Sequence, residues 1–308
     1  MFGLRYHVAS LAAVFVALAV GILLGVAISG RVTDAGEGLE EELLRGENQR
    51  LQQDLDAARA AADSTARRGE ASEELIARAY PTLMDNRLED ENVAVLFLGP
   101  ADGALRAEVE GALADADAGA PSRVVAMDVP VDADELQSAL EGDELLASYA
   151  NEDGDFSDLG RELGRELVEG GDTPLWGALS TQLVEERSGT TSVPVDSVVV
   201  VATWLPDEPA DGDEEPADES TASLMEGLVR GADGTGVPVV GVAETSEPSE
   251  TVEFYLDQGV SAVDDIDTQP GRLALALLLA GAEPGHYGVS EDADGVIPPI
   301  EPLTVEGE

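Results

Sequence analysis

The sequence predicts an α/β protein built from three consecutive parts: a single N-terminal transmembrane helix, a short coiled-coil stalk and a three-layer domain around a mostly parallel sheet. Three observations lead to this prediction. The chain opens on an uncharged apolar run, continues with a heptad pattern, and then alternates short β-branched runs with helical periodicity. We place these parts at residues 1–30, 31–80 and 81–283, and the Pro and Gly content predicts an irregular tail at 284–308.

The net charge of −48 comes from 64 acidic residues against 16 basic ones, all of them Arg, and the chain contains no Lys and no Cys. These absences exclude Schiff-base and Walker-type lysines, thiolate nucleophiles, disulfides, zinc–thiolate sites and a polybasic nucleic-acid face. Disordered chains are also acidic, but 44% hydrophobic residues in periodic runs indicate a folded body. We therefore expect an acidic, halophilic protein, because surface carboxylates repel one another only weakly when the Debye length falls to about 3 Å at 1 M salt.

Residues 8–29 read VASLAAVFVALAVGILLGVAIS, a run of 22 residues without a charge. As a helix this run is about 33 Å long, which is enough to cross a bilayer once. A cleaved signal peptide is the alternative, although its apolar region would have only about 7 to 15 residues. Arg5 precedes the run and several acidic residues follow it, so the positive-inside rule predicts a cytoplasmic N-terminus and an extracytoplasmic body.

Two features predict a homodimer. Small residues recur every four positions in the apolar run, with Gly21 and Gly25 as a GxxxG pair that lets helices approach closely, although Ala and Gly are also common in membrane helices generally. Between positions 44 and 65 a heptad seam follows, with Asn48 at an a position, where one polar residue typically sets the register of a two-stranded coiled coil. A lone amphipathic helix is the alternative, and Gly69 is the predicted end of the helix.

The body alternates unbroken apolar runs with helical stretches. Such runs are typical of strands buried on both faces of a parallel sheet, and their alternation with helices predicts a three-layer, Rossmann-like arrangement. The segment 206–220, PDEPADGDEEPADES, is predicted to be an acidic, solvated loop. The predicted strands are 93–98, 123–129, 195–202, 237–242 and 260–263, and the predicted helices lie near 105–116, 156–167, 173–183, 224–230, 252–256 and 270–280.

Residues that carry known chemistries are largely missing. The loop 99–103 follows the first predicted strand, where such folds bind ligands, but it lacks GxGxxG and we interpret it as a turn. GxSxG is absent, His7 adjoins the membrane and His286 falls in the tail, so no Ser-His-Asp device is expected. None of the acidic clusters has EF-hand spacing. We therefore predict no enzyme, no cofactor and no nucleic-acid partner.

Four segments resemble a known family: LRYHVASLAAVFVALAVGILLG, ENQRLQQDL, DDIDTQPGRLALALLLA and GHYG. Together they resemble the actinobacterial MctB family of copper transport outer-membrane proteins. The resemblance implies an envelope protein with one membrane helix, a coiled coil and an α/β domain, associated with copper efflux or tolerance; some relatives are instead linked to regulating cell-wall hydrolases at division. The family-motif positions, to which we assign no role, are Asp264, Asp265, Asp267, Thr268, Gly271, Gly285, Tyr287 and Gly288.

The residues themselves do not predict a copper site. Cu(I) prefers thiolate or thioether ligands and Cu(II) favours imidazole. The chain offers no Cys, two His, and only Met1, Met84, Met127 and Met225 without motif spacing. Two hypotheses follow: a copper-homeostasis transport component, from the resemblance, and an anchored dimeric scaffold that docks another envelope protein, from the stalk and the missing chemistry.

Overall fold

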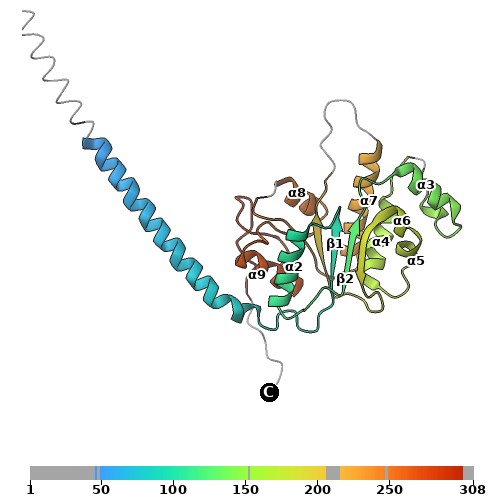
Figure 1. Ribbon diagram of the computed structural model, residues 1–308, viewed down its shortest axis with the longest axis horizontal. Coiled ribbons are helices and arrows are strands. Elements are labelled where there is room, and N and C mark those ends of the chain that lie inside the picture. Colours follow the sequence, from blue (N-terminus) through green and yellow to red (C-terminus); the bar gives the residue numbers. More distant parts are fainter. Residues whose placement is uncertain (1–45, 47–48, 152, 206–215, 247–248, 301–308) are drawn as a thin grey trace, which may run out of the picture. The chain divides into compact units, whose positions relative to one another are not determined.

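The computed structural model describes residues 46, 49–151, 153–205, 216–246 and 249–300 (Figure 1). The chain divides into two compact units, Met1–Glu73 and Glu74–Glu308. The first unit is helical from residue 49 to its end, and the second is helical as far as residue 84. The helix therefore does not end at Gly69 as predicted, because one glycine costs only about 1 kcal/mol relative to Ala and the surrounding Ala, Arg and Glu residues are strong helix formers.

The predicted anchor at residues 1–30, including Gly21 and Gly25, lies outside the described ranges, as does Asn48. Within those ranges no helix combines the length and the apolar character that crossing a membrane requires. Residues 49–73 are exposed almost throughout. The apolar seam is part of this exposed surface, since Leu51 is 60% exposed and Leu55 is 49% exposed.

The second unit is built around one sheet. Its strands are β1 (Val93–Leu98), β2 (Arg123–Met127), β3 (Val184–Gly189), β4 (Ser197–Ala202), β5 (Val239–Val242), β6 (Ser261–Val263) and β7 (His286–Tyr287). They lie in the order β3-β2-β1-β4-β5-β6-β7, and every neighbouring pair is parallel except β2 with β3. β1 and β4 are buried along their whole length, which confirms the prediction of a mostly parallel sheet from unbroken apolar runs.

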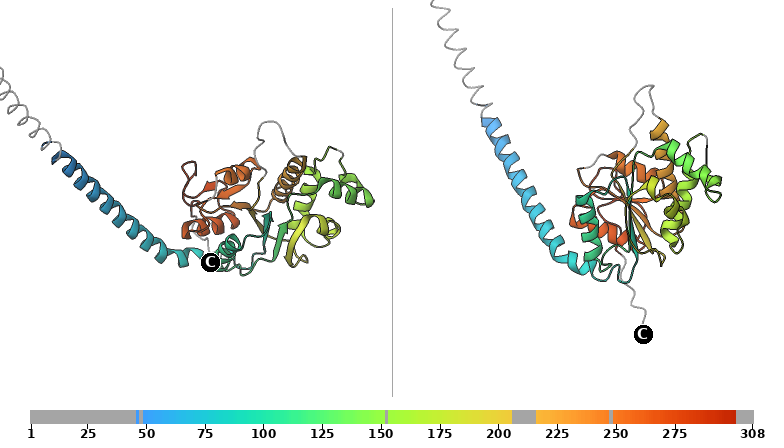
Figure 2. Two further views of the ribbon diagram at one scale, coloured as in Figure 1. Left: turned by 45° about the horizontal axis from the view of Figure 1, so that its top comes forward. Right: turned by 45° about the vertical axis from the view of Figure 1, so that its right-hand side comes forward.

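Helices cover both faces of this sheet, so the unit has three layers (Figure 2). One core forms under α2 (Gly103–Asp115) and α9 (Gln269–Leu279), together with Tyr80, Met84 and Leu88. The helices of the other face contribute to a second core; they are α3 (Ala133–Gly142), α4 (Ser157–Glu169), α5 (Pro174–Ala178), α6 (Ser180–Leu183), α7 (Pro216–Asp233) and α8 (Ser249–Asp257). A short 3₁₀ helix, η1 (Ala147–Tyr149), follows α3.

Four elements are absent from the sequence prediction: α3, η1, β3 and β7. β7 lies in the tail predicted to be irregular, and residues 216–220, predicted as the end of the acidic loop, are helical. β3 and β7 have no apolar run of their own because each lies at an edge of the sheet and is held by its neighbour. The sequence did contain a signal for α3, because Asp is a preferred N-cap residue and Asp132 directly precedes the helix. In the structure its side chain accepts a hydrogen bond from the amide of Glu135.

Arg123, the first residue of β2, is buried at 2% exposure. Its guanidinium donates to three carbonyl oxygens, those of Thr190 at 3.1 Å, Val193 at 3.0 Å and Leu167. Leu167 lies in the last turn of α4, where carbonyl groups lack partners within the helix. Burial lowers the pKa of Arg123, and the side chain ties the end of α4 to the segment that leads into β4.

The backbones of α4 and α7 are in direct contact through four glycines. Gly160 and Gly164 lie one turn apart on α4, and Gly227 and Gly231 lie one turn apart on α7. A Cβ atom on any of them would overlap a backbone oxygen of the facing helix; these oxygens belong to Leu224, Leu228, Ser157 and Arg161, respectively. Only glycine permits this approach, as in the GxxxG pairs of membrane helices.

We expect Gly231→Ala to lower the free energy of unfolding by about 1–3 kcal/mol, because the added methyl group forces two helix backbones apart. Gly111→Ala is the matched control. Gly111 lies inside α2, and its Cβ would meet only the Arg272 guanidinium at an ordinary 3.7 Å, so the change should be neutral or stabilise by up to about 1 kcal/mol. Urea unfolding followed by circular dichroism checks both variants, and equal midpoints for the two would contradict the close contact.

Candidate functional site

The parallel strands β1, β4, β5 and β6 end at one edge of the sheet, where folds of this class bind ligands. The loop 99–103 after β1 is held by hydrogen bonds within the protein. The hydroxyl of Thr203 donates to the carbonyl of Pro100 at 2.8 Å, and Asp102 caps α2 by accepting hydrogen bonds from two of its first amides. A phosphate would need those amides, so the geometry agrees with the interpretation of this loop as a turn.

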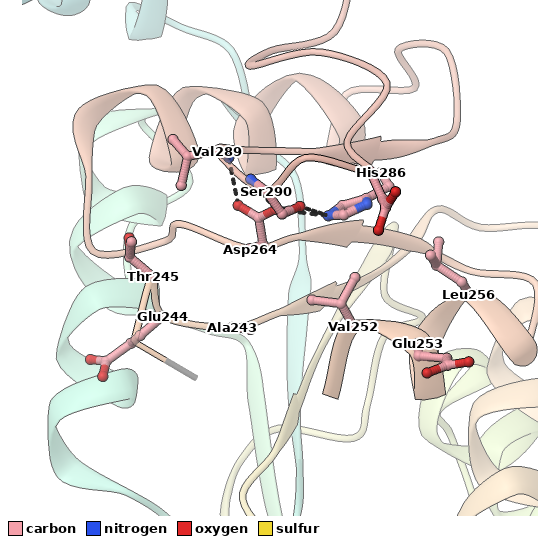
Figure 3. A pocket seen from close by; sticks show the side chains of 11 residues that line it. Ala243, Glu244, Thr245, Val252, Glu253, Leu256, Asp264, His286, Val289 and Ser290 are labelled. Atoms are coloured by element: carbon pink, nitrogen blue, oxygen red, sulfur yellow. Dashed lines mark hydrogen bonds and ion pairs between the residues drawn. The ribbon is translucent and has the colours of Figure 1, made fainter. Parts of the chain in front are cut away.

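A cavity of about 510 Å³ lies at the same edge beside the ends of β5, β6 and β7 (Figure 3). Its size is that of a small-molecule site. One part of its lining is apolar, and α8 supplies much of this part: Ala243, Val252, Leu256 and Val289. The other part is polar and mostly acidic: Glu244, Thr245, Glu253, Asp264, His286, Ser290 and Asp292.

Asp264 follows β6 and is the centre of the hydrogen-bond network at this cavity. Its Oδ1 accepts from the amide of Val289 at 2.7 Å, and its Oδ2 accepts from the amide and the hydroxyl of Ser290 at 3.2 and 2.5 Å. His286 Nε2 lies 2.8 Å from the same Oδ2. Burial raises the pKa of Asp264, but the hydrogen bonds outweigh burial and hold the pKa below its ordinary value. Asp264 is therefore an anion that fixes the segment 286–290.

The imidazole of His286 has a defined orientation because Asp264 carries no proton. Nε2 must then supply the hydrogen of their contact, and in the neutral ring Nδ1 is left as an acceptor. The His286 side chain is only 7% exposed, and no described residue donates a hydrogen bond to Nδ1. Ser290 does not complete a Ser-His-Asp triad, since its hydroxyl donates to Asp264 on the same oxygen that the imidazole uses.

The loop after β5 is held by a second carboxylate. Asp267 Oδ1 accepts from the amide of Thr245 at 2.9 Å and from its hydroxyl at 2.8 Å. Burial raises the pKa of Asp267, but these hydrogen bonds outweigh it and lower the pKa. Burial and the negative charge of Asp267 raise the pKa of Glu244 beside the loop. The hydroxyl groups of the cavity wall thus donate to carboxylates of the protein itself.

Asp265 is fully buried just before α9, where Thr268 is the N-cap. The Thr268 hydroxyl lies 2.8 Å from Asp265 Oδ2 and 2.9 Å from the Asp265 carbonyl oxygen, while Oδ1 has no partner among the described residues. Burial raises the pKa of Asp265 to about 6, against the opposing effect of the Thr268 hydrogen bond. When Asp265 is protonated, its Oδ2–H donates to the Thr268 hydroxyl while that hydroxyl donates to the Asp265 carbonyl.

We expect the free energy of unfolding to carry a pH dependence that belongs to Asp265. Its pKa is about 6 in the folded state against an ordinary 3.8, so the folded state holds this proton more tightly. The contribution is fully present below pH 3.8 and is lost as pH rises through 6, a change of about 3 kcal/mol. Asp265→Asn should therefore gain stability relative to the parent as pH rises from 4 to 7.5, measured by urea unfolding. A constant difference between the two proteins would contradict the assignment.

The eight family-motif positions lie together around this network. Four of them supply the hydrogen bonds described above: Asp264, Asp265, Asp267 and Thr268. Two glycines make room, since a Cβ on Gly271 would overlap the Asp265 carbonyl and one on Gly288 would overlap the Asp264 carboxylate. Gly285 and Tyr287 flank His286 in sequence, and the Tyr287 hydroxyl donates to the carbonyl of Glu283 at 3.2 Å.

Sequence reasoning missed Thr245, Glu253, His286 and Ser290 as residues of this site. The segment GHYGVS contains two of them, and the signal that could have found them is its pair of glycines around a histidine. We predicted no role for His286 because it falls in the tail. β7 instead pairs this segment with β6 and brings His286 to Asp264.

The described residues do not form a copper site with soft ligands. Met84, Met127 and Met225 are 1%, 0% and 0% exposed, so their sulfur atoms face the two cores. Across the described ranges, no group of three or more His, Cys, Asp or Glu side chains is arranged to hold a metal ion. Met1 and His7 lie outside these ranges.

Comparison with protein families bears on the whole chain. Residues 1–298 match the family described as "Copper transport outer membrane protein, MctB". No curated protein matches the sequence. The matched range contains the apolar N-terminal run, the stalk, the sheet and the cavity, and it confirms the resemblance found in the four sequence segments. Because the match covers nearly all of the 308 residues, the chain belongs to the MctB family of copper transport outer membrane proteins.

Proposed function

We propose that the protein acts in copper homeostasis of the cell envelope as an anchored dimer whose α/β domain recognises another molecule and whose Met84, Met127 and Met225 thioethers do not carry copper. Membership of a copper transport family supports the copper role. The observation that carries the finer proposal is the burial of Met84, Met127 and Met225.

Thioether transfer of Cu(I) requires sulfur atoms that an incoming ion can reach. Met84 belongs to the core under α2 and α9, and Met127 and Met225 belong to the core on the other face. A metal ion bound at these sulfur atoms would displace the side chains packed around them on both faces of the sheet. We therefore assign the transfer of copper ions to another molecule of the cell envelope, with which this protein works.

A deletion strain complemented with the full chain tests this assignment. The variant Met84→Leu/Met127→Leu/Met225→Leu should fold normally, because Leu nearly conserves the volume of each buried side chain. It should also return copper tolerance, measured as the copper concentration that halves growth, to the parental value. Equal abundance in the membrane fraction is the control for folding.

An abundant triple variant that leaves the strain as copper-sensitive as the deletion would overturn the assignment. A deletion that leaves copper tolerance unchanged and impairs septation would replace the copper role with the cell-wall role of some relatives.

The dimer is supported by the exposed seam at Leu51 and Leu55. The next seam position is Ala58, whereas Ala60 lies on the outer face of the same heptad. Because the chain has no Cys, a single substitution gives an unambiguous crosslink. Ala58→Cys should form a disulfide-linked dimer in oxidised membranes, and Ala60→Cys, an equally exposed Ala, should remain largely monomeric on non-reducing gels. Equal crosslinking of both variants, or of neither, would contradict a two-stranded stalk.

A further inference from the structure

We propose that the cavity beside β5, β6 and β7 binds the protonated amine of a ligand that carries this amine on an apolar stem. The proposal concerns a recognition site and does not depend on the copper role. Three observations support it: the hydrogen-bonding groups of the cavity wall that have no partner among the described residues, the equally unpartnered Nδ1 on the buried side chain of His286, and the exposed apolar side chains of the wall.

The polar wall of the cavity offers acceptors. Its side-chain donors are already used: the hydroxyl of Thr245 donates to Asp267, and the hydroxyl of Ser290 and Nε2 of His286 both contact Asp264. The groups that remain are Nδ1 of His286 and the carboxylates of Glu253 and Asp292, which line the same cavity. A ligand that fits them must bring hydrogen-bond donors and positive charge. An alkylammonium group has three N–H donors and no acceptor.

His286 distinguishes this cavity from the acidic surface elsewhere. Carboxylates are so abundant in this chain that their presence alone has no meaning, but the His286 side chain is 93% buried and held by Asp264. It lines the cavity, and Nδ1 receives no hydrogen bond from the residues that the structure describes. Because Asp264 fixes Nε2, Nδ1 is the ring nitrogen left for a ligand, and its position is set before a ligand binds.

The apolar wall explains why a stem accompanies the amine. Leu256 is 43% exposed and Val289 is 57% exposed, and Val252 lies beside them in the cavity. Methylene groups that lead to a charged amine pack on such side chains while the charge stays at the polar end. The chain cannot supply a lysine to itself or to a second copy, because it contains none. The amine therefore comes from a small molecule or from a lysine side chain of another protein.

Calorimetric titration of the detergent-solubilised full chain with hexylamine tests the proposal. We use pH 8 and about 1 M KCl, where screening weakens non-specific attraction to the acidic surface. Hexylamine should bind with 1:1 stoichiometry, and hexan-1-ol, which lacks the charge, should bind at least about tenfold more weakly. Nα-acetyl-lysine methylamide separates the two sources: binding at least as tight as that of hexylamine indicates a protein lysine, and weaker binding indicates a free amine.

Two variants of α8 provide the matched comparison. Glu253→Gln removes a carboxylate of the cavity and should weaken hexylamine binding by about tenfold or more. Glu250→Gln removes an exposed carboxylate of the same helix that does not line the cavity, and binding should stay within about twofold. Equal effects of the two variants, or equal binding of amine and alcohol, would overturn the proposal. So would 1:1 binding of Cu(II) without binding of the amine, which would make the cavity a metal site.

Discussion

The contact between α4 and α7 is the constraint on which one whole face of the domain depends. Four glycines bring the two helix backbones together, and both helices contribute apolar residues to the same core. Helices with large side chains between them usually pack with their axes about 8–10 Å apart, whereas these glycines let the two backbones touch. The helix α8 contributes to the same core and supplies much of the apolar wall of the cavity.

Beside the edge strand β7, two neighbouring carboxyl groups have opposite environments. Asp264 and Asp265 follow β6, and successive side chains of extended backbone point in opposite directions. Asp264 meets donors from the segment 286–290 and stays ionised, whereas Asp265 is buried against α9 and favours its proton. One side of the chain thus carries an ionised carboxylate at the cavity, and the other side carries a buried carboxyl group whose pKa is raised to about 6.

Much of the architecture could be predicted from the sequence because it depends on local patterns. β1 and β4 are unbroken apolar runs, and the apolar residues of α9 follow a helical period after a Thr-x-Pro start. β3 could not be predicted, because it pairs with β2, which lies far away in the sequence. β7 has only two residues, which is too short to leave a periodic signal. The site could not be predicted for a different reason. Among 64 acidic residues, Asp264 and Asp265 differ from solvated carboxylates only in their burial and in hydrogen bonds that the sequence does not reveal.

The burial of Arg123 has a consequence for a protein of this composition. Carbonyl oxygens stabilise the positive charge of its guanidinium, and none of its three hydrogen bonds goes to a carboxylate. Carbonyl groups neither titrate nor attract counterions as carboxylates do. The acceptors that hold the junction between α4 and the segment before β4 therefore do not titrate, unlike the carboxylates on the outer surface.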